Sequence, residues 1–248
     1  STTAKFAVYD DTGTNVVSAV SVETSVSTAT ANYSMISIVA TGADATVGPT
    51  NNRIVVDVAE AAENDNDLFV YNYTGALTVA EFGPDNTIAI DVTMNNILEA
   101  ATINTTRFVT IWFDDGTGGN AISYSIYDEL GTQIVGLTDI DASSGTINHV
   151  AITNLDRNKF AMAFYDGADA DITLAINDID NNALLAATDI DTSAGTDSRV
   201  ALATVRAPGN KTDFLVLAWW NQNAQSINAT VYNGTGTQIT APFYVDAA

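Results

Sequence analysis

One short segment occurs five times in the sequence, and it constrains the fold more than any other feature. In each copy an Asp or Asn usually opens a short loop, and a Gly or Asn follows where the backbone φ angle must be positive. Segments of β-type alternation flank the loop, which is the pattern of two strands joined by a type I turn with a glycine bulge. The copies lie at 9–17, 71–75, 127–135, 177–181 and 232–239.

Aligned on this hairpin, the chain divides into repeats of roughly 50 to 56 residues. Each repeat has four strand-like segments, named a to d in chain order, and the clearest are at 149–153, 160–165, 172–176 and 183–187. No segment shows sustained helical spacing. The repeat therefore predicts an all-β fold, a β-propeller in which each repeat is a blade. Tandem β-sandwiches are the alternative, but they would have seven or more strands in each repeat.

The repeats predict one domain of residues 1–248 with four four-stranded blades and an N-terminal half blade, a five-bladed-like arrangement. The half blade supplies only strands c and d. Either one blade of five is a bare hairpin, or strands from elsewhere complete it. Strand b is apolar on both faces, which predicts an inner strand, and strand c alternates, which predicts a half-exposed one. The half blade is at 1–24, and the blades are at about 33–85, 86–141, 147–191 and 197–246.

Charge and composition exclude several classes of partner. The chain has 8 Lys and Arg against 30 Asp and Glu, a net charge of −22, so we expect no binding to nucleic acid. The longest apolar run, 214–220, is too short for a membrane helix, so we expect no membrane span. The Thr- and Asn-rich, Lys-poor composition and a start at Ser1 without Met favour an exported protein, extracellular or at the cell surface.

The residues that most catalytic sites need are scarce. There is no cysteine, and His149 is the one histidine, which excludes catalytic triads and zinc sites built from several such residues. His149 aligns with Arg199 on strand a, which favours a packing or surface role. Two carboxylates alone could hydrolyse a glycoside, but 30 acids offer no particular pair. We therefore expect no enzyme, with glycoside hydrolysis as the less favoured possibility.

An aromatic-rich strand b followed by a short Asp/Asn–Gly hairpin resembles the blade plan of the lectin-type β-propellers, the five-bladed tachylectin-like and six-bladed fucose-lectin-like proteins. Those lectins place aromatic and polar or basic side chains in pockets between blades. The resemblance implies a glycan site in the same position on each blade here. The implied candidates on one register of strand b are Trp112, Phe164 and Trp219, with Asp114, Asp166 and Asn221 after the strand. The aromatic residues in the other register of strand b are Phe113, Tyr165 and Trp220.

Other polar residues recur at matching positions, which favours a structural role in tying each blade to the next. A basic residue precedes strand b at Arg53, Arg107 and Lys159. An acid closes strand d at Glu23, Asp85, Asp141, Asp191 and Asp246.

Two linkers between blades carry oxygen ligands at alternate positions, a spacing that could suit Ca²⁺. The linkers lack the central Gly and bidentate Glu of a strong calcium loop. Calcium is the one possible cofactor that we expect. The candidate ligands are Asp139, Asp141 and Ser143 in one linker, and Asp189, Asp191, Ser193 and Asp197 in the other.

Two functions follow from these features. The first is a self-assembling structural subunit of a filament, sheath or surface layer, in which residues 5–23 offer an unpaired strand edge to another copy of the chain. The second, the alternative, is a glycan-binding lectin. The sequence favours the first.

Overall fold

A computed structural model gives the fold of the chain. Within the residues that it describes, every regular element is a β-strand, and the strands form five antiparallel sheets. The prediction of an all-β fold is therefore confirmed. None of the described segments is a helix long and apolar enough to cross a membrane. The described residues are 4–9, 12–23, 36–41, 52–60, 65–73, 79–81, 86–89, 98–114, 121–141, 145, 149–196, 198–206 and 213–247.

The five sheets follow one another along the chain. The hairpin sheet contains β1 (Ala4–Tyr9) and β2 (Asn15–Glu23). Sheet 1 contains β3 (Ile36–Thr41), β4 (Asn52–Glu60), β5 (Asp65–Tyr73), β6 (Val79–Glu81) and β7 (Asn86–Ala89). Sheet 2 contains β8 (Leu98–Asn104), β9 (Arg107–Asp114), β10 (Ala121–Asp128) and β11 (Gln133–Asp141). Sheet 3 contains β12 (Val150–Asp156), β13 (Lys159–Asp166), β14 (Asp171–Asp178) and β15 (Ala183–Asp191). Sheet 4 contains β16 (Arg199–Val205), β17 (Phe214–Asn221), β18 (Ser226–Asn233) and β19 (Gln238–Ala247).

Sheets 2, 3 and 4 are simple meanders of four strands in chain order, as the repeats predicted. Two details differ from the sequence-based boundaries. β7 pairs with β5 and so belongs to sheet 1, although the repeat boundaries place 86–89 in the second blade. In addition, 98–104 forms the first strand of sheet 2, which the sequence did not reveal because its apolar residues do not alternate cleanly.

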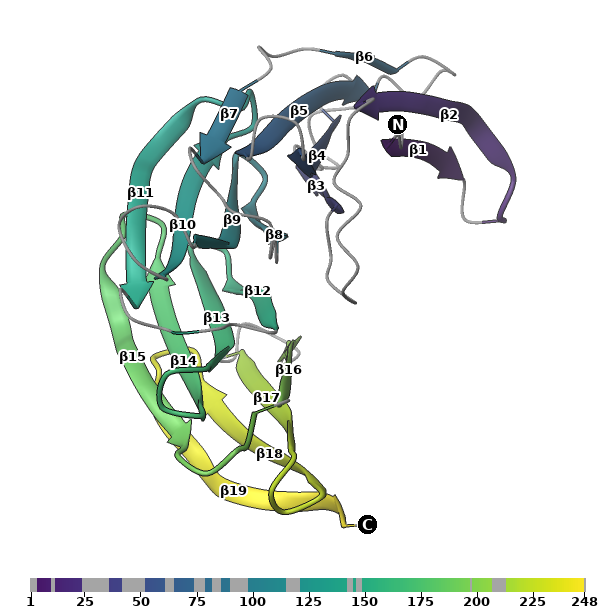
Figure 1. The fold of residues 1–248 in the computed structure, drawn as a ribbon. Coiled ribbons are helices and arrows are strands. Elements are labelled where there is room, and N and C mark those ends of the chain that lie inside the picture. The colour runs from purple at the N-terminus through teal and green to yellow at the C-terminus, as the bar shows by residue number, and fades with distance from the viewer. Residues whose placement is uncertain are drawn as a thin grey trace.

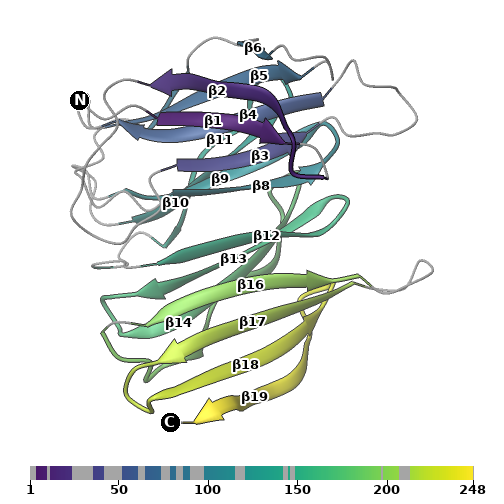
Figure 2. The ribbon, with the colours of Figure 1, turned by 90° about the vertical axis from the view of Figure 1, so that its right-hand side faces the viewer.

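The sheets stack side by side along an open arc (Figure 1). The first strand of each larger sheet, namely β3, β8, β12 or β16, lies on the concave side of the arc, and β11, β15 and β19 lie on the convex side. The hairpin sheet is at one end of the arc and sheet 4 is at the other. Figure 2 shows the concave side, where the first strands run across the view one above the other.

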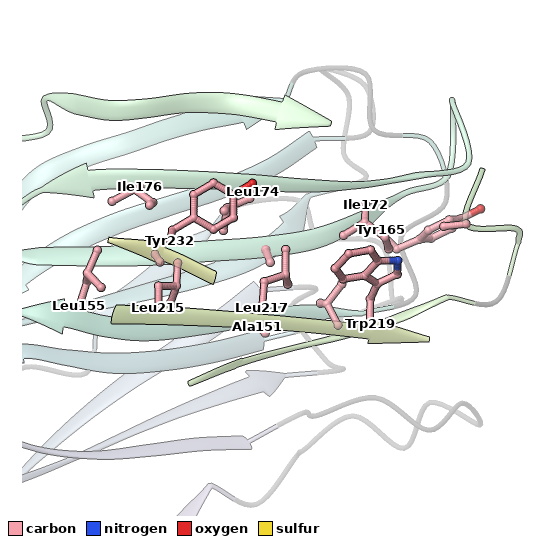
Figure 3. Close-up of a cluster of buried hydrophobic side chains, with 14 residues drawn as sticks. Ala151, Leu155, Tyr165, Ile172, Leu174, Ile176, Leu215, Leu217, Trp219 and Tyr232 are labelled. Carbon is pink, nitrogen blue, oxygen red and sulfur yellow. The ribbon is translucent and has the colours of Figure 1, made fainter. Parts of the chain in front are cut away.

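Apolar side chains fill each junction between neighbouring sheets. One cluster joins sheets 2 and 3, a second joins sheets 3 and 4 (Figure 3), and a third joins sheets 1 and 2. A fourth joins the hairpin sheet to sheet 1 through Phe6, which packs near Val56, Val58 and Tyr71. Burial of these faces is the main force that holds the stack together.

In sheets 2 and 3, burial confirms the expectation for strand b and contradicts that for strand c. β9 and β13 are buried on both faces, as predicted. β10 and β14 are also buried along almost their whole length, whereas β11 and β15 are largely exposed. The polar positions of strand c, such as Ser123 and Thr173, face the preceding sheet. Because these side chains are small, the neighbouring sheet can approach and cover them.

The repeated turn has the predicted chemistry. Asp128 Oδ1 accepts hydrogen bonds from the amides of Leu130 and Thr132, and Asp178 and Asn233 do the same in sheets 3 and 4. The positive-φ position is Gly13, Gly131 or Gly236 at φ 81° to 83°, and Asn181 at φ 68°. The copy at 71–75 extends beyond the described residues.

Candidate functional site

Basic side chains at the start of strand b tie neighbouring sheets together. Arg107 in β9 donates a hydrogen bond to the carbonyl of Ile179 at 3.3 Å and lies 3.9 Å from the carboxylate of Asp180. Lys159, at the same position in β13, donates to the carbonyl of Gly234 at 3.0 Å. Each acceptor lies in the last turn of the following sheet. The structural role predicted for these basic residues is thus confirmed at two junctions.

An acid at the end of strand d ties sheet 3 to sheet 4. Asp191 Oδ2 accepts hydrogen bonds from Trp219 Nε1 and Asn221 Nδ2, both at 2.7 Å. Burial acts to raise the pKa of Asp191, but these bonds and those from Ser193 outweigh it and lower the pKa below its ordinary value. Asp191 therefore has the structural role that its repeated position predicted.

The junction of sheets 2 and 3 places two acids where the next junction has an acid and an amide. Asp141 ends β11 as Asp191 ends β15, and Asp166 stands where sheet 4 has Asn221. Burial, and next the hydrogen bond with Asp141, raise the pKa of Asp166 to about 7. Burial and the charge of Asp189 raise the pKa of nearby Asp171 to about 6. When protonated, Asp166 can donate a hydrogen bond to Asp141, in the place where the amide of Asn221 donates to Asp191.

The aromatic rings that were expected to line glycan pockets lie in the core. Trp112 and Phe164 have no exposed surface, and Trp219 is 2% exposed. Figure 3 shows Trp219 with Leu217 in the cluster between sheets 3 and 4. A buried ring offers no face to a sugar, so the prediction for these three rings is wrong. They lie on the face of strand b that the preceding sheet covers, as Trp219 does against sheet 3.

The polar residues predicted beside those rings also serve the fold. Asp166 Oδ1 accepts a hydrogen bond from the amide of Ala168 at 2.8 Å, and Asn221 Oδ1 accepts one from the amide of Ala224 at 2.7 Å. Both side chains are buried. The side chain of Asp114 lies outside the described residues. The two described residues hold turns and sheet junctions.

Several candidate calcium ligands have protein partners. Asp139 accepts a hydrogen bond from Ser123 Oγ at 2.8 Å, and Asp189 accepts one from Thr173 Oγ1 at 3.4 Å. Among the described residues, no group of three or more His, Cys, Asp or Glu side chains is placed to hold a metal ion. Ser143 and Asp197 lie outside the described residues. Calcium binding by the linkers stays a prediction.

Two further titratable groups, one partly buried and one fully buried, have shifted pKa values. Burial and the charge of Arg199 lower the pKa of His149, which is consistent with the packing role that was expected. Asp57 in β4 is fully buried, and burial and the charge of Asp67 raise its pKa well above the ordinary value. Sequence reasoning missed Asp57, although an acid inside an otherwise apolar strand, 54–58, was a visible signal.

The described residues form a pocket on the concave side of the arc, at the ends of the first strands of four neighbouring sheets. We call it the axial pocket, and its volume is about 840 Å³. The strands that contribute are β3, β8, β12 and β16, together with the β8–β9 and β12–β13 turns. Its lining residues are Ala40, Thr41, Ala101, Thr102, Ile103, Asn104, Thr105, Ile152, Thr153, Asn154, Arg157, Thr204 and Arg206.

Hydrogen bonds between sheets fix the wall of the axial pocket. Thr102 Oγ1 in β8 donates to the carbonyl of Ala40 in β3 at 2.6 Å. Asn154 Nδ2 in β12 donates to the carbonyl of Ile103 in β8 at 2.8 Å. Thr204 Oγ1 in β16 donates to the carbonyl of Asn154. Since each first strand is bonded to the one before it, the wall is a preorganised surface rather than a set of separate loops.

Two arginines lie at the rim of this wall. Arg157 is in the β12–β13 turn, and Arg206 directly follows β16. Both are exposed, and Arg206 Nη2 donates to Asn154 Oδ1 at 3.2 Å. Sequence reasoning missed this site because its residues come from four repeats and share no motif. The available signal was that Arg157 and Arg206 are two of only eight Lys and Arg residues.

The sequence matches no protein-family model and no curated protein. Solved structures do match. A variant of the Aleuria aurantia lectin in complex with Fucα1-6GlcNAc is 14% identical, with a TM-score of 0.58, over 86% of this chain and 62% of the lectin. The fucose-specific lectin from Aleuria aurantia is 12% identical, with a TM-score of 0.56, over 85% of this chain and 61% of the lectin.

A variant of AofleA from Arthrobotrys oligospora is also similar, at 10% identity and a TM-score of 0.56, over 86% of this chain and 57% of that chain. The chain thus spans less than two thirds of the length of each of these proteins. At such low identity the likeness concerns the fold. Together with the repeated meander sheets, it shows that the chain has a fold of the β-propeller type, similar to that of these lectins.

Proposed function

We propose that this protein is a non-enzymatic, glycan-binding lectin and that the axial pocket is a binding site. The observation that carries the proposal is the fold, which is shared with lectins described as fucose-specific and as bound to a fucosyl disaccharide. An extracellular or cell-surface location belongs to the same proposal, as does the identification of the five sheets with four blades and a half blade.

The chemistry of the axial pocket suits a sugar. Thr, Asn and Arg side chains supply hydrogen-bond donors and acceptors for hydroxyl groups, and Ala40, Ala101, Ile103 and Ile152 supply apolar patches for C–H groups. No aromatic ring is among the lining residues. Recognition would therefore depend on hydrogen bonds rather than on stacking.

The same lining argues against glycoside hydrolysis. That reaction usually needs two carboxyl groups on either side of the scissile bond. None of the residues that line the axial pocket is Asp or Glu. Asp166, an acid with a raised pKa, belongs to a sheet junction through its hydrogen bond with Asp141.

A glycan array probed with fluorescently labelled protein tests the proposal. We expect hits that are lost when Thr105, an exposed residue of the pocket lining, is replaced in Thr105→Trp, because the large ring would fill the pocket. Leu130→Trp places the same ring on an exposed turn away from the pocket and should keep the hits. An array without hits for folded protein would contradict the proposal.

A second function, assembly, is favoured by one observation. The second strand of sheet 4 is covered on only one face, unlike β9 and β13. On its other face Val216, Ala218 and Trp220 stand where sheet 3 has the buried residues Ala161, Ala163 and Tyr165. Neighbouring side chains are exposed, with Val205 at 53%, Phe243 at 45% and Ile227 at 41%. We call this apolar surface the outer face of sheet 4.

The occupant that best fits the outer face is the hairpin sheet of a second copy. At each junction inside the stack, the face that corresponds to the outer face of sheet 4 packs against the following sheet. The third strand of that following sheet contributes side chains to the contact. β1 aligns with that third strand, and Lys5 and Tyr9 on its corresponding face are exposed. A head-to-tail contact would therefore continue the existing stack and would build a ring or an open filament.

A further inference from the structure

We propose that the axial pocket selects glycans that carry an anionic group, a carboxylate or a sulfate, and that Arg157 and Arg206 bind this group. The inference rests on the proposed glycan binding and adds the class of ligand. Guanidinium groups match the planar fork of a carboxylate and can also hold a sulfate through parallel hydrogen bonds.

The placement of the two arginines is unusual for this chain. Acids outnumber basic residues by 30 to 8, so an exposed Arg would normally lie close to a carboxylate. Arg107 forms an ion pair with Asp180, and Lys159 forms one with Asp156. Neither involves an arginine of the pocket.

The acid nearest in sequence is already occupied. Asp156 precedes Arg157, but its Oδ2 lies 2.9 Å from Lys159 Nζ, and its Oδ1 accepts a hydrogen bond from the amide of Asn158 at 2.9 Å. Both oxygens of the Asp156 carboxylate therefore have partners within the β12–β13 turn and its flanking strand. None of the residues that line the pocket is itself an acid.

Arg206 is held in place by a neutral partner. Its Nη2 donates to Asn154 Oδ1, while Asn154 Nδ2 donates to the carbonyl of Ile103. Asn154 is therefore fixed by one sheet and orients an arginine from another. An arginine that is positioned by an amide keeps its full charge and its remaining N–H donors for a ligand.

The net charge of −22 does not rule out an anionic ligand. At physiological salt, exposed charges are largely screened beyond about 8 Å, whereas groups in direct contact are screened much less. Contacts with the two guanidinium groups would therefore decide affinity. Raising the salt from low to physiological concentration should weaken the binding of an anion to this pocket. The loss of affinity should be smaller than for an anion that binds to a protein with a basic surface.

Calorimetric titration of the 1–248 chain with four probes tests the inference. Trigalacturonate carries carboxylates only, galactose 6-sulfate carries a sulfate only, and galactotriose and L-fucose are neutral. We expect at least one anionic probe to bind about tenfold or more tightly than the neutral ones. The anionic probe that binds identifies the source of the charge.

Variants locate the effect. Arg157→Gln with Arg206→Gln should abolish the preference for the anionic probe, by a loss of about tenfold or more in affinity, and leave weak neutral binding in place. Arg199→Gln removes the same charge from an exposed position outside the pocket and should change little. Circular dichroism would check that each variant is folded.

Each outcome bears on a different statement. Equal affinity for neutral and anionic probes, or a preference that survives the double substitution, would overturn the anionic inference and leave glycan binding intact. If folded protein binds neither these probes nor any glycan on the array, the proposed function fails, and the inference fails with it.

Discussion

Single residues explain why one junction between sheets should respond to pH and the next should not. Asp191 meets donors from Trp219 and Asn221, whereas Asp141 meets another acid, Asp166. The repeat made it possible to predict from sequence that these positions tie blades together. The direction of each pKa could not be predicted, because it depends on burial and on the side chain across the junction.

We predict that Asp166→Asn stabilises the protein above neutral pH. The pKa of Asp166 is raised from its ordinary value to about 7, so its contribution to stability is complete below about pH 4 and is lost as the pH rises through 7. Asn cannot ionise and can donate to Asp141, as Asn221 does to Asp191. The gain at pH 8 should be about 1 to 2 kcal/mol after allowance for solvent screening.

Thermal melts between pH 4 and pH 8 check this prediction. The variant should show a weaker fall in melting temperature with rising pH than the parent, with some dependence left because the pKa of Asp171 is also raised. Asp246→Asn, at an exposed acid, is the control. Parallel curves for the parent and Asp166→Asn would contradict the account of this junction.

At the scale of elements, the repeated hairpin could be predicted well, because an Asp or Asn acceptor and a positive-φ residue leave a local signature. The exposure of strand c could not be predicted from the sequence. The alternation of apolar and polar residues is the same whether the polar face is covered by a neighbouring sheet or by water. Ser123 and Ser125 are fully buried for this reason. The linkers were likewise recognised as copies, but their packing was not visible in the sequence.

We predict that Gly145→Ala is strongly destabilising. Gly145 has φ +63°, and a Cβ there would lie 2.5 Å from the backbone nitrogen of Ala168, in the turn between β13 and β14. The clash and the strain together should cost on the order of 3 kcal/mol or more. Gly136→Ala, which meets nothing within 4 Å, is the matched control and should be near neutral. Urea melts measure both, and equal midpoints would refute the proposed linker packing.

At the scale of the molecule, the β-propeller plan was predicted from the length of the repeat and from its four strands, and the likeness to lectins from the aromatic-rich strand b and its hairpin. The binding surface did not follow, because the axial pocket gathers residues from four sheets, as Thr102, Asn154 and Arg206 illustrate. The expectation of pockets floored by aromatic rings failed for a related reason. A ring on strand b can face either neighbour, and here the preceding sheet covers Trp112 completely.

We predict that the outer face of sheet 4 mediates any self-association of the chain. Trp220→Glu places a charge in the middle of this apolar surface and should reduce the mass of the native particle to that of a monomer, without loss of β circular dichroism. Deletion of residues 1–24 should do the same, since it removes the complementary hairpin. Sedimentation equilibrium over a range of concentrations measures the mass, and a parent protein that stays monomeric throughout would rule out assembly.

The central claim is that a glycan binds in the axial pocket rather than between the blades. Hydrogen–deuterium exchange of the 1–248 chain, with and without saturating trigalacturonate, tests it most directly. We predict slower exchange in peptides that cover 101–106, 152–158 and 204–206, which contribute to the pocket. Slower exchange confined to peptides around Trp112, Phe164 and Trp219, with the pocket segments unchanged, would contradict the claim.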